Sequence, residues 1–220
     1  AGSLPALVAD TNLSCSLEAI YVYLDHDERS KFAHGQFEQV ISEVQSQISS
    51  VSNSPSTTPT ETSAAVKTSI RVIFNHVVME YIWMVRRQAN EDANDHFNFG
   101  GYDDPISESF LDPIKLVEVR FNNNVRVQQR SGQYFRLVEP WQHHTNIPRE
   151  FIYMYSFAVD PEDAQPTGGA NHSRIDNVNL NLDLDARIFS SASSLADIFV
   201  YARNKNLLRF KHGLISKKFG

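Results

Sequence analysis

Strict alternation of apolar and polar residues recurs along the chain and predicts β-strands. Residues 178–184 alternate Val or Leu with Asn or Asp, which predicts a strand with one face in water. Residues 77–85 place five apolar side chains, Trp83 among them, on one face, so we expect this strand to be central. Further strands are expected at 17–24, 70–74, 114–121, 125–129, 198–202 and 207–210.

The segment 151–159 is aromatic, uncharged and apolar on both faces. A strand of this kind must be covered on both sides, and no helical pattern lies nearby, so we expect a second sheet as the cover. The same aromatic residues could form a stacking platform for bases or sugars. The apolar character of both faces and the few basic flanking residues favour a core strand instead.

Turn residues separate several of these strands. Asn122-Asn123-Asn124 stands between two alternating runs, and because Asn tolerates positive φ, the run predicts a tight hairpin. The polar stretch 203–206 (RNKN) predicts another hairpin, with the break between strands 198–202 and 207–210.

One segment has a helical pattern. In 25–49, apolar residues recur three and four positions apart, which taken alone predicts a helix. These residues are Phe37, Val40, Ile41, Val44 and Ile48.

Two polar stretches are expected to be loops. Residues 50–63 are of low complexity and predict an exposed loop between core elements. In 89–105, Asn, Asp and Gly surround Phe97, Phe99 and Tyr102. Many short strands joined by long polar loops predict an all-β sandwich of the jelly-roll or a related Greek-key kind, and 220 residues fit one such domain spanning 1–220.

Composition narrows the function. The net charge of −6 argues against a general nucleic-acid binder. The single cysteine, Cys15, excludes an intramolecular disulfide or a cysteine-based zinc site and favours a reducing compartment. No stretch approaches the roughly 20 apolar residues that span a bilayer. The start of the chain does not resemble a signal peptide, and the missing initiator Met suggests a processed chain or a fragment.

Histidines are the most tempting ligands. His143 and His144 are adjacent, so in a strand they would point to opposite faces and could not chelate one metal. His76, His96 and His172 could converge on them through folding, as in a cupin-like metalloenzyme, but the H-x-H of that class is absent. We expect the histidines to hydrogen-bond loop backbone groups instead.

Two acidic clusters could supply an acid and a base. The first holds Asp25, Asp27 and Glu28 beside His26 and Arg29. Such a charge run after an apolar stretch is more typical of a solvated turn or a helix start.

The second cluster, 160–163 (DPED), has the composition of a turn. Gly168-Gly169 is expected to supply positive φ, not to cradle phosphate. Nucleotide-binding and serine-hydrolase motifs are missing. Asn12 and Asn171 begin glycosylation tripeptides that we expect to be unused. We therefore assign no catalytic, cofactor-binding or metal-binding residue.

Several stretches, in order, resemble one family. They are 134–148 (YFRLVEPWQHHTNIP), 152–158 (IYMYSFA), 161–168 (PEDAQPTG), 171–177 (NHSRIDN), and, less completely, 21–33, 74–83 and 201–209. These stretches resemble the major capsid protein of nucleocytoplasmic large DNA viruses.

The resemblance implies a jelly-roll β-sandwich of two four-stranded antiparallel sheets with long loops and short helices. Members of the family carry two jelly rolls in one chain about twice this length, so the chain resembles the second, C-terminal one and is expected to be a fragment. The resemblance also implies that part of 25–49 is strand, in conflict with its helical spacing.

The implied function is structural. Family members form homotrimers, which build pseudo-hexagonal capsomers that tile an icosahedral shell over an internal membrane. The expected location is the virion, with assembly in the host cytoplasm. The expected partners are copies of the chain, neighbouring capsomers and minor capsid proteins, with no direct nucleic-acid contact, no membrane insertion and no cofactor.

Two further expectations follow from this reading. Arg174 and Asp176 are expected to pair and fix the loop that enters strand 178–184. Loops 50–63 and 89–105 are candidates for the outward or inter-capsomer surface. A carbohydrate-binding jelly-roll module is the alternative, because sandwiches with aromatic and Asp/Asn-rich loops often bind glycans.

Overall fold

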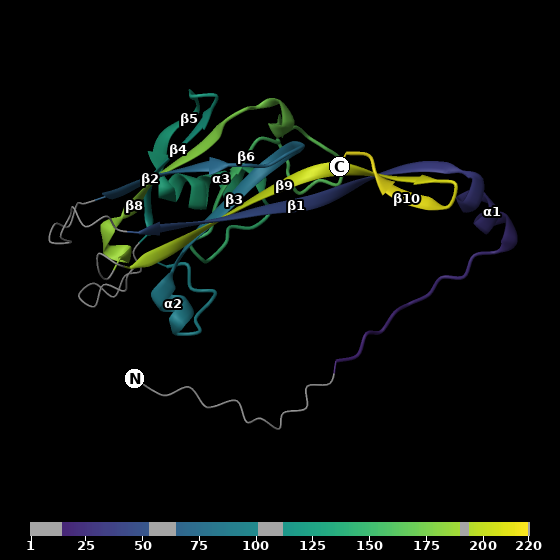
Figure 1. The fold of residues 1–220 in the computed structure, drawn as a ribbon, viewed down its shortest axis with the longest axis horizontal. Coiled ribbons are helices and arrows are strands. Elements are labelled where there is room, and N and C mark those ends of the chain that lie inside the picture. The colour runs from purple at the N-terminus through teal and green to yellow at the C-terminus, as the bar shows by residue number, and fades with distance from the viewer. Residues whose placement is uncertain (1–14, 53–64, 101–111, 190–193, 220) are drawn as a thin grey trace.

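Two antiparallel sheets make up most of the computed structural model, which describes residues 15–52, 65–100, 112–189 and 194–219 (Figure 1). Sheet A has the order β1 (Gln36–Ser52), β9 (Leu195–Lys211), β3 (Val77–Arg87), β6 (Tyr153–Ser156), with short β10 (Leu214–Lys217) on β9 and β7 (Ala170–Asn171) on β3. Sheet B has the order β2 (Ala65–Val72), β8 (Val178–Asp185), β4 (Ile114–Phe121), β5 (Asn124–Ser131).

The strand pairs are nested. β1 pairs with β9, β2 with β8, β3 with β6 and β4 with β5, all antiparallel. A long hairpin of this kind, rolled up so that its pairs fall alternately in two sheets, is a jelly roll. The predicted fold class is therefore confirmed. Sheet B has the expected four strands, and sheet A adds two short strands to its four.

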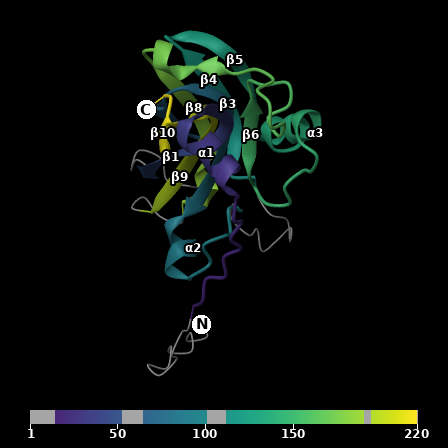
Figure 2. The same cartoon turned by 90° about the vertical axis from the view of Figure 1, so that its right-hand side faces the viewer.

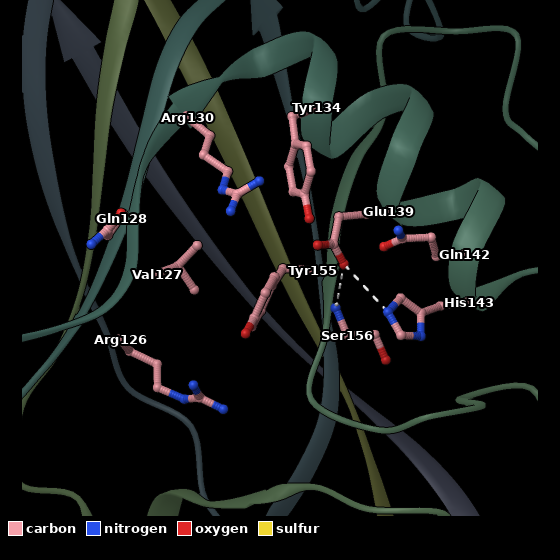
Figure 3. Close-up of a pocket in the computed structure, with 10 residues that line it drawn as sticks. All are labelled: Arg126, Val127, Gln128, Arg130, Tyr134, Glu139, Gln142, His143, Tyr155 and Ser156. Atoms are coloured by element: carbon pink, nitrogen blue, oxygen red, sulfur yellow. Dashed lines mark hydrogen bonds and ion pairs between the residues drawn. The ribbon is translucent and has the colours of Figure 1, made fainter.

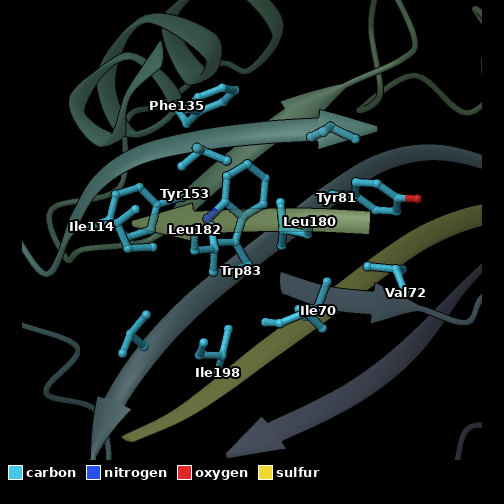
Figure 4. Packing of buried hydrophobic residues seen from close by; sticks show 14 of the residues in the cluster. Ile70, Val72, Tyr81, Trp83, Ile114, Phe135, Tyr153, Leu180, Leu182 and Ile198 are labelled. Carbon is cyan, nitrogen blue, oxygen red and sulfur yellow. The ribbon is translucent and has the colours of Figure 1, made fainter. Parts of the chain in front are cut away.

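The core lies between the two sheets (Figure 4). Trp83 and Tyr81 of β3 face Leu180 and Leu182 of β8, and all four are fully buried. The indole of Trp83 stacks on the ring of Tyr153 with centroids 6.2 Å apart. Each such side chain contributes roughly 1.5–3 kcal/mol on burial. The expected central position of 77–85 and the half-exposed character of 178–184 are both confirmed. The prediction of one continuous apolar face in 77–85 was wrong at its start, because the register shifts between Val78 and Glu80, so that Val78 joins the core and Val77 is 40% exposed.

The connection from β5 to β6 folds into two helical turns, η1 (Tyr134–Val138) and α3 (Glu139–His143), beside the edge strand β6 (Figure 2). Phe135 of η1 is fully buried, with its ring 5.5 Å from that of Trp83. The expectation that only a sheet would cover 151–159 was therefore wrong. The strand itself spans only Tyr153–Ser156, and Val159 is 76% exposed.

The segment 25–49 contains both predicted structures in succession. α1 (His26–His34) comes first, and β1 starts at Gln36. The helix prediction was wrong for β1, where Val40, Val44 and Ile48 lie on one face of the strand. Steps of four residues are even numbers, so they keep to one face of a strand as well as of a helix.

β9 crosses the predicted hairpin at 203–206 without a break. Asn204 and Asn206 point inward in step with Ala202, so the period of two continues through the polar stretch. The chain turns later, at His212 and Gly213, which have φ of 52° and 76°, and β10 follows. The hairpin at Asn122-Asn123 is confirmed, with φ of 49° and 66°.

β1 and β9 extend together beyond the sandwich as an arm, with α1 and β10 at its end (Figure 1). Residues 17–24 are not the predicted strand. Within the described residues they have no regular structure, and the large apolar side chains from Leu17 to Tyr23 are 76–97% exposed.

Three short helical elements lie in connections: α2 (Gln88–Asp92), η2 (His172–Arg174) and η3 (Ala186–Ile188). The predicted loop 89–105 therefore opens with α2. In the same loop Phe97 is exposed, Phe99 packs on the core, and Tyr102 lies outside the described residues. Most of the loop 50–63 also lies outside them. Among the described residues, none of the helices has the length and apolar content needed to cross a membrane.

Candidate functional site

A cavity of about 390 Å³ opens between β5, the α3 helix and β6 (Figure 3). β5 contributes two arginines, of which Arg130 lies over the ring of Tyr134 at 4.4 Å. α3 contributes Glu139, Gln142 and His143, and β6 contributes Tyr155 and Ser156. The sequence reasoning missed this cavity, because its walls come from four elements, β5, η1, α3 and β6, whose positions only the folded chain defines.

Glu139 is the buried charge of the cavity, 4% exposed. Its Oε2 lies 3.5 Å from the backbone N–H of Ser156 and 3.9 Å from Nε2 of His143. The first contact ties α3 to β6, and the second lies within α3. The Ser156 hydroxyl donates to the carbonyl of Ala158 at 2.7 Å, and His143 bonds the carbonyl of Val159 at 2.9 Å. The side chain of Tyr134 also hydrogen-bonds Glu139, so the arrangement joins η1, α3 and β6.

The cavity tyrosines remain protonated at neutral pH. Burial, and secondarily Glu139, raises the pKa of Tyr134, and burial raises the pKa of Tyr155. A phenol whose pKa lies above its usual value of about 10 is a hydrogen-bond donor, not a base, near pH 7. The cavity can therefore offer phenol donors to a polar group.

His144 forms a second polar site, on the outward face of sheet A. Its Nε2 lies 2.9 Å from Oε2 of Glu80, which is 1% exposed, and its Nδ1 lies 3.2 Å from Oε1 of Glu162. Arg203 lies 3.4 Å from the other oxygen of Glu80. Glu80 is the main cause of a raised pKa at His144. We call Glu80, His144, Glu162 and Arg203 the charge clamp, since they fasten the loop after β6 to β3 and β9.

The remaining histidines are separate. His143 bonds the carbonyl of Val159 at 2.9 Å, and His172 bonds that of Ala170 at 2.8 Å, which confirms the expected backbone contacts for these two. Burial lowers the pKa of His172, whose ring also contacts the Tyr81 hydroxyl. His96 bonds the side-chain oxygen of Asn94 at 2.9 Å, and His144 contacts the carboxylates of Glu80 and Glu162, so the expected backbone contacts were wrong for these two. No three His, Cys, Asp or Glu side chains of the described residues gather closely enough to hold a metal ion.

Both acidic clusters form local caps or turns, and Glu162 of the second also reaches His144. Asp25 is the N-cap of α1, and its side chain accepts from the N–H of Glu28 at 2.8 Å. The Asp160 carboxylate accepts from the N–H groups of Glu162 and Asp163, which closes the predicted turn. Gly168 has a φ of 143°, as expected, but Gly169 does not have a positive φ, so the prediction was wrong for Gly169.

The predicted pair of Arg174 and Asp176 is wrong: within the described residues the two form no ion pair. The loop before β8 is held instead by Asn122 and Asn177, which exchange hydrogen bonds of 2.8 and 3.0 Å. Asn171 is exposed, and its side chain accepts from the N–H of Ser173. Asn12 lies outside the described residues.

The outward faces of the sheets differ. On sheet A, the register aligns Ile48, Phe199 and Met84 in one row and Tyr201, Ile82 and Met154 in the next. Ile48 is 61% exposed and the nearby Val44 66%. On sheet B the outward face is polar, with Ser69 bonded to Asn181 and Asn181 to Glu118. Of these apolar residues, Val44 and Ile48 of β1 are the strongly exposed ones, whereas Met154 is buried and Arg86 lies over Phe199. Exposed apolar side chains that lie together are typical of a contact surface.

Comparison with known proteins decides the family. Residues 28–216 match the family described as large eukaryotic DNA virus major capsid protein. The chain belongs to this family. It is 31% identical to the major capsid protein of Pyramimonas orientalis virus over 91% of this chain and 48% of that protein. It is 28% identical to that of Phaeocystis pouchetii virus, over 91% and 52%.

The fold agrees with this membership. A solved structure of the capsid of PBCV-1 virus superposes with a TM-score of 0.69 at 25% identity, over 91% of this chain and 55% of that one. The Faustovirus major capsid protein shares the fold at 15% identity, with a TM-score of 0.59. The chain spans about half the length of the curated relatives it matches. As a capsid protein it is a structural component of the virion and not an enzyme, as predicted.

Proposed function

We propose that this chain is the C-terminal jelly roll of a longer capsid protein, which forms homotrimers that act as pseudo-hexagonal capsomers of an icosahedral shell. The observation that carries the proposal is a complete eight-strand nesting in a chain that spans about half of its capsid relatives. A polypeptide of twice the length has room for a second sandwich of the same size.

The surface of the sandwich supports self-association. The apolar rows on the outward face of sheet A offer an area that a neighbouring sandwich could cover, whereas sheet B presents a polar face. Partners in the shell would then be copies of the chain, neighbouring capsomers and minor capsid proteins. The loops 50–63 and 89–105 remain candidates for the contacts between capsomers or for the outer surface.

The location of assembly follows from the same proposal. We place it in the host cytoplasm, with the shell enclosing an internal membrane that this protein does not enter. The net charge of −6 suits a protein without direct nucleic-acid contact.

Light scattering or mass photometry of the full-length capsid protein tests the proposal. We expect a particle of three times the subunit mass, which persists on dilution to nanomolar concentration. A stable monomer or dimer would contradict the trimer. Substituting Ile48 by Asp in the same protein should weaken association if sheet A is the contact face, and Ser69→Asp on sheet B is the matched control.

A further inference from the structure

The cavity between β5, η1, α3 and β6 has almost entirely polar walls (Figure 3). Of the ten residues that line it, only Val127 has a purely hydrocarbon side chain, and Val127 is 8% exposed. A site for an apolar ligand, or for the apolar anchor of a protein partner, needs hydrocarbon walls. The ligand that fits this cavity is therefore rich in hydrogen-bonding groups.

Two arginines of β5 favour an anion. Arg126 and Arg130 are exposed, and in the part of the chain that the structure describes neither forms an ion pair with a carboxylate. Arg130 lies over the ring of Tyr134 at 4.4 Å, which holds its guanidinium at the cavity. A guanidinium binds a carboxylate through two parallel hydrogen bonds, so a carboxylate suits this wall.

Glu139 limits the kind of anion. Its carboxylate is 4% exposed and faces the same cavity (Figure 3). Two arginines and one glutamate leave a net charge of +1 on the lining residues when His143 is neutral. A single negative charge balances this wall, whereas a phosphate dianion would exceed it and lie close to the Glu139 carboxylate.

The cavity also offers partners for hydroxyl groups. Glu139 accepts a hydrogen bond from Tyr134 and a long one, 3.5 Å, from the N–H of Ser156. A carboxylate has about four acceptor positions, so Glu139 keeps capacity for hydroxyl donors of a ligand. The hydroxyl of Tyr155 points toward the side of the cavity that Arg126 lines (Figure 3).

Size agrees with a small polar molecule. The volume of about 390 Å³ lies near the lower end of the range for small-molecule sites, roughly 300–1,000 Å³. A ligand with one carboxylate and several hydroxyl groups on adjacent carbons combines all of these requirements. Sugar acids have this chemistry.

We propose that the cavity binds an acidic sugar, a pyranose that carries one carboxylate, such as glucuronate. Arg126 and Arg130 bind its carboxylate, and Glu139 accepts hydrogen bonds from its ring hydroxyls. The carbohydrate binding considered from the sequence is then an additional property of the capsid protein itself. The inference does not depend on the trimer.

Calorimetry on the full-length capsid protein at neutral pH tests the ligand. We expect saturable binding of methyl glucuronide with one site per chain, and binding at least about 10-fold weaker for methyl glucoside, which lacks the carboxylate. Inorganic phosphate tests the charge count and should bind less tightly than methyl glucuronide. Equal affinity for the two sugars, or tighter binding of phosphate, would overturn the proposal. Trimers that bind no glucuronide would also overturn it and leave the proposed function intact.

An exposed arginine locates the site. Arg126→Ala should weaken the binding of methyl glucuronide at least about 10-fold and leave that of methyl glucoside unchanged, because only the first has a carboxylate. The matched control is Arg174→Ala, which removes the same charge from another exposed arginine without an ion pair and should leave both affinities unchanged. Equal weakening by the two substitutions would show a general charge effect and reject the site.

Glu139→Gln tests the contact with the hydroxyl groups. It keeps the size of the side chain and removes the negative charge from the lining residues, so glucuronide should bind several-fold more weakly and phosphate more tightly. Unchanged affinities for both ligands would reject the role of Glu139. If this buried substitution unfolds the protein, the result with Arg126→Ala decides the proposal.

A free sugar acid and the end of a glycan chain share this chemistry. A disaccharide that ends in glucuronate distinguishes the two sources in the same calorimetric experiment. Binding tighter than that of methyl glucuronide would identify the end of a glycan chain as the ligand, since the second ring adds contacts. Weaker binding would identify the free sugar acid. A disaccharide bound equally well without its carboxylate would contradict the proposal.

Discussion

The inward-facing residues of strand β9 are apolar in one part of the strand and polar in another. Within the sandwich its inward residues are Ala196, Ile198, Val200 and Ala202, all fully buried beneath sheet B. At the base of the arm its inward residues are Asn204 and Asn206, 0% and 2% exposed.

The buried polar part is hydrogen-bonded by side chains of β1 and by the carbonyl of Phe219. Asn204 accepts from the side-chain amide of Gln45 at 3.0 Å, and Asn206 donates to Glu43 at 3.0 Å and to the carbonyl of Phe219 at 2.7 Å. The comparison shows that an inward position of β9 needs an apolar side chain only where sheet B covers it. Beyond sheet B, polar side chains can be buried because they form hydrogen bonds with neighbouring segments.

The largest effect is expected in the apolar part. Trp83→Ala should lower the free energy of unfolding by about 3–5 kcal/mol, because it removes a fully buried ring and leaves a cavity. Urea unfolding measures the loss. The matched control is the other tryptophan, Trp141, which is 72% exposed and whose replacement by Ala should cost little. Equal losses at the two positions would contradict the described core.

A smaller effect is expected at the base of the arm. Asn206→Ala removes the donor to the Phe219 carbonyl and one of the donors to Glu43, which keeps Lys217, at a cost of about 1–3 kcal/mol. Hydrogen exchange should show faster exchange in 207–211 than in 196–202, because the change is local. Asn179→Ala, on the outward face of β8, is the control. Uniform loss of protection over all of β9 would mean that the two parts are not distinct.

The smallest effect concerns the outward side of the same sheet. His144→Gln removes the imidazolium of the charge clamp and should cost about 1 kcal/mol, because the glutamine amide can still donate to the buried Glu80, which also keeps Arg203, and Glu162 is exposed. Glu80 raises the pKa of His144 above its unfolded value, so the stabilisation is complete below about pH 6.5 and is lost as the pH rises through the folded pKa.

Melting temperatures measured across pH test this prediction. The difference between His144→Gln and the unchanged chain should be greatest at mildly acidic pH and vanish at alkaline pH. Measurements at very low pH are left out of this comparison, because Glu162 becomes protonated there. A hydrogen bond from Thr145 is the first cause of the lowered pKa of Glu162. His26→Gln, at a histidine 90% exposed, should show no such profile. A difference that grew with pH would refute the assignment.

The sequence correctly predicted those elements whose apolar pattern fits only a strand or only a turn. β3, β8 and the β4–β5 hairpin follow from alternation and from residues that accept positive φ. β1 was misread because steps of four fit a strand and a helix equally. The break expected at 203–206 failed because polarity was taken as exposure, whereas Asn204 and Asn206 are buried by partners in β1, far away in the chain.

The polar sites were less predictable than the strands. His144 was noticed only beside His143, yet its ion-pair partners, Glu80 and Glu162, come from distant segments that meet through the sheet topology. The cavity at Glu139 depends in the same way on the path of η1 and α3 along the sandwich. Local sequence patterns contain no information on contacts between residues that lie far apart in the chain. The acidic turns at Asp25 and Asp160 depend on neighbouring residues and were predicted correctly.

The pairing of β9 limits how this protein can aggregate. One side of β9 is occupied by β1 throughout, and the other passes from β3 to β10. β6, at the far border of sheet A, is short and lies beside α3. Among the described strands of that sheet, the long unpaired backbone is therefore the outer side of β1. Fibre growth by addition of a further strand would start at this free edge. A proline at a residue of β1 whose backbone N–H points away from β9 should block it.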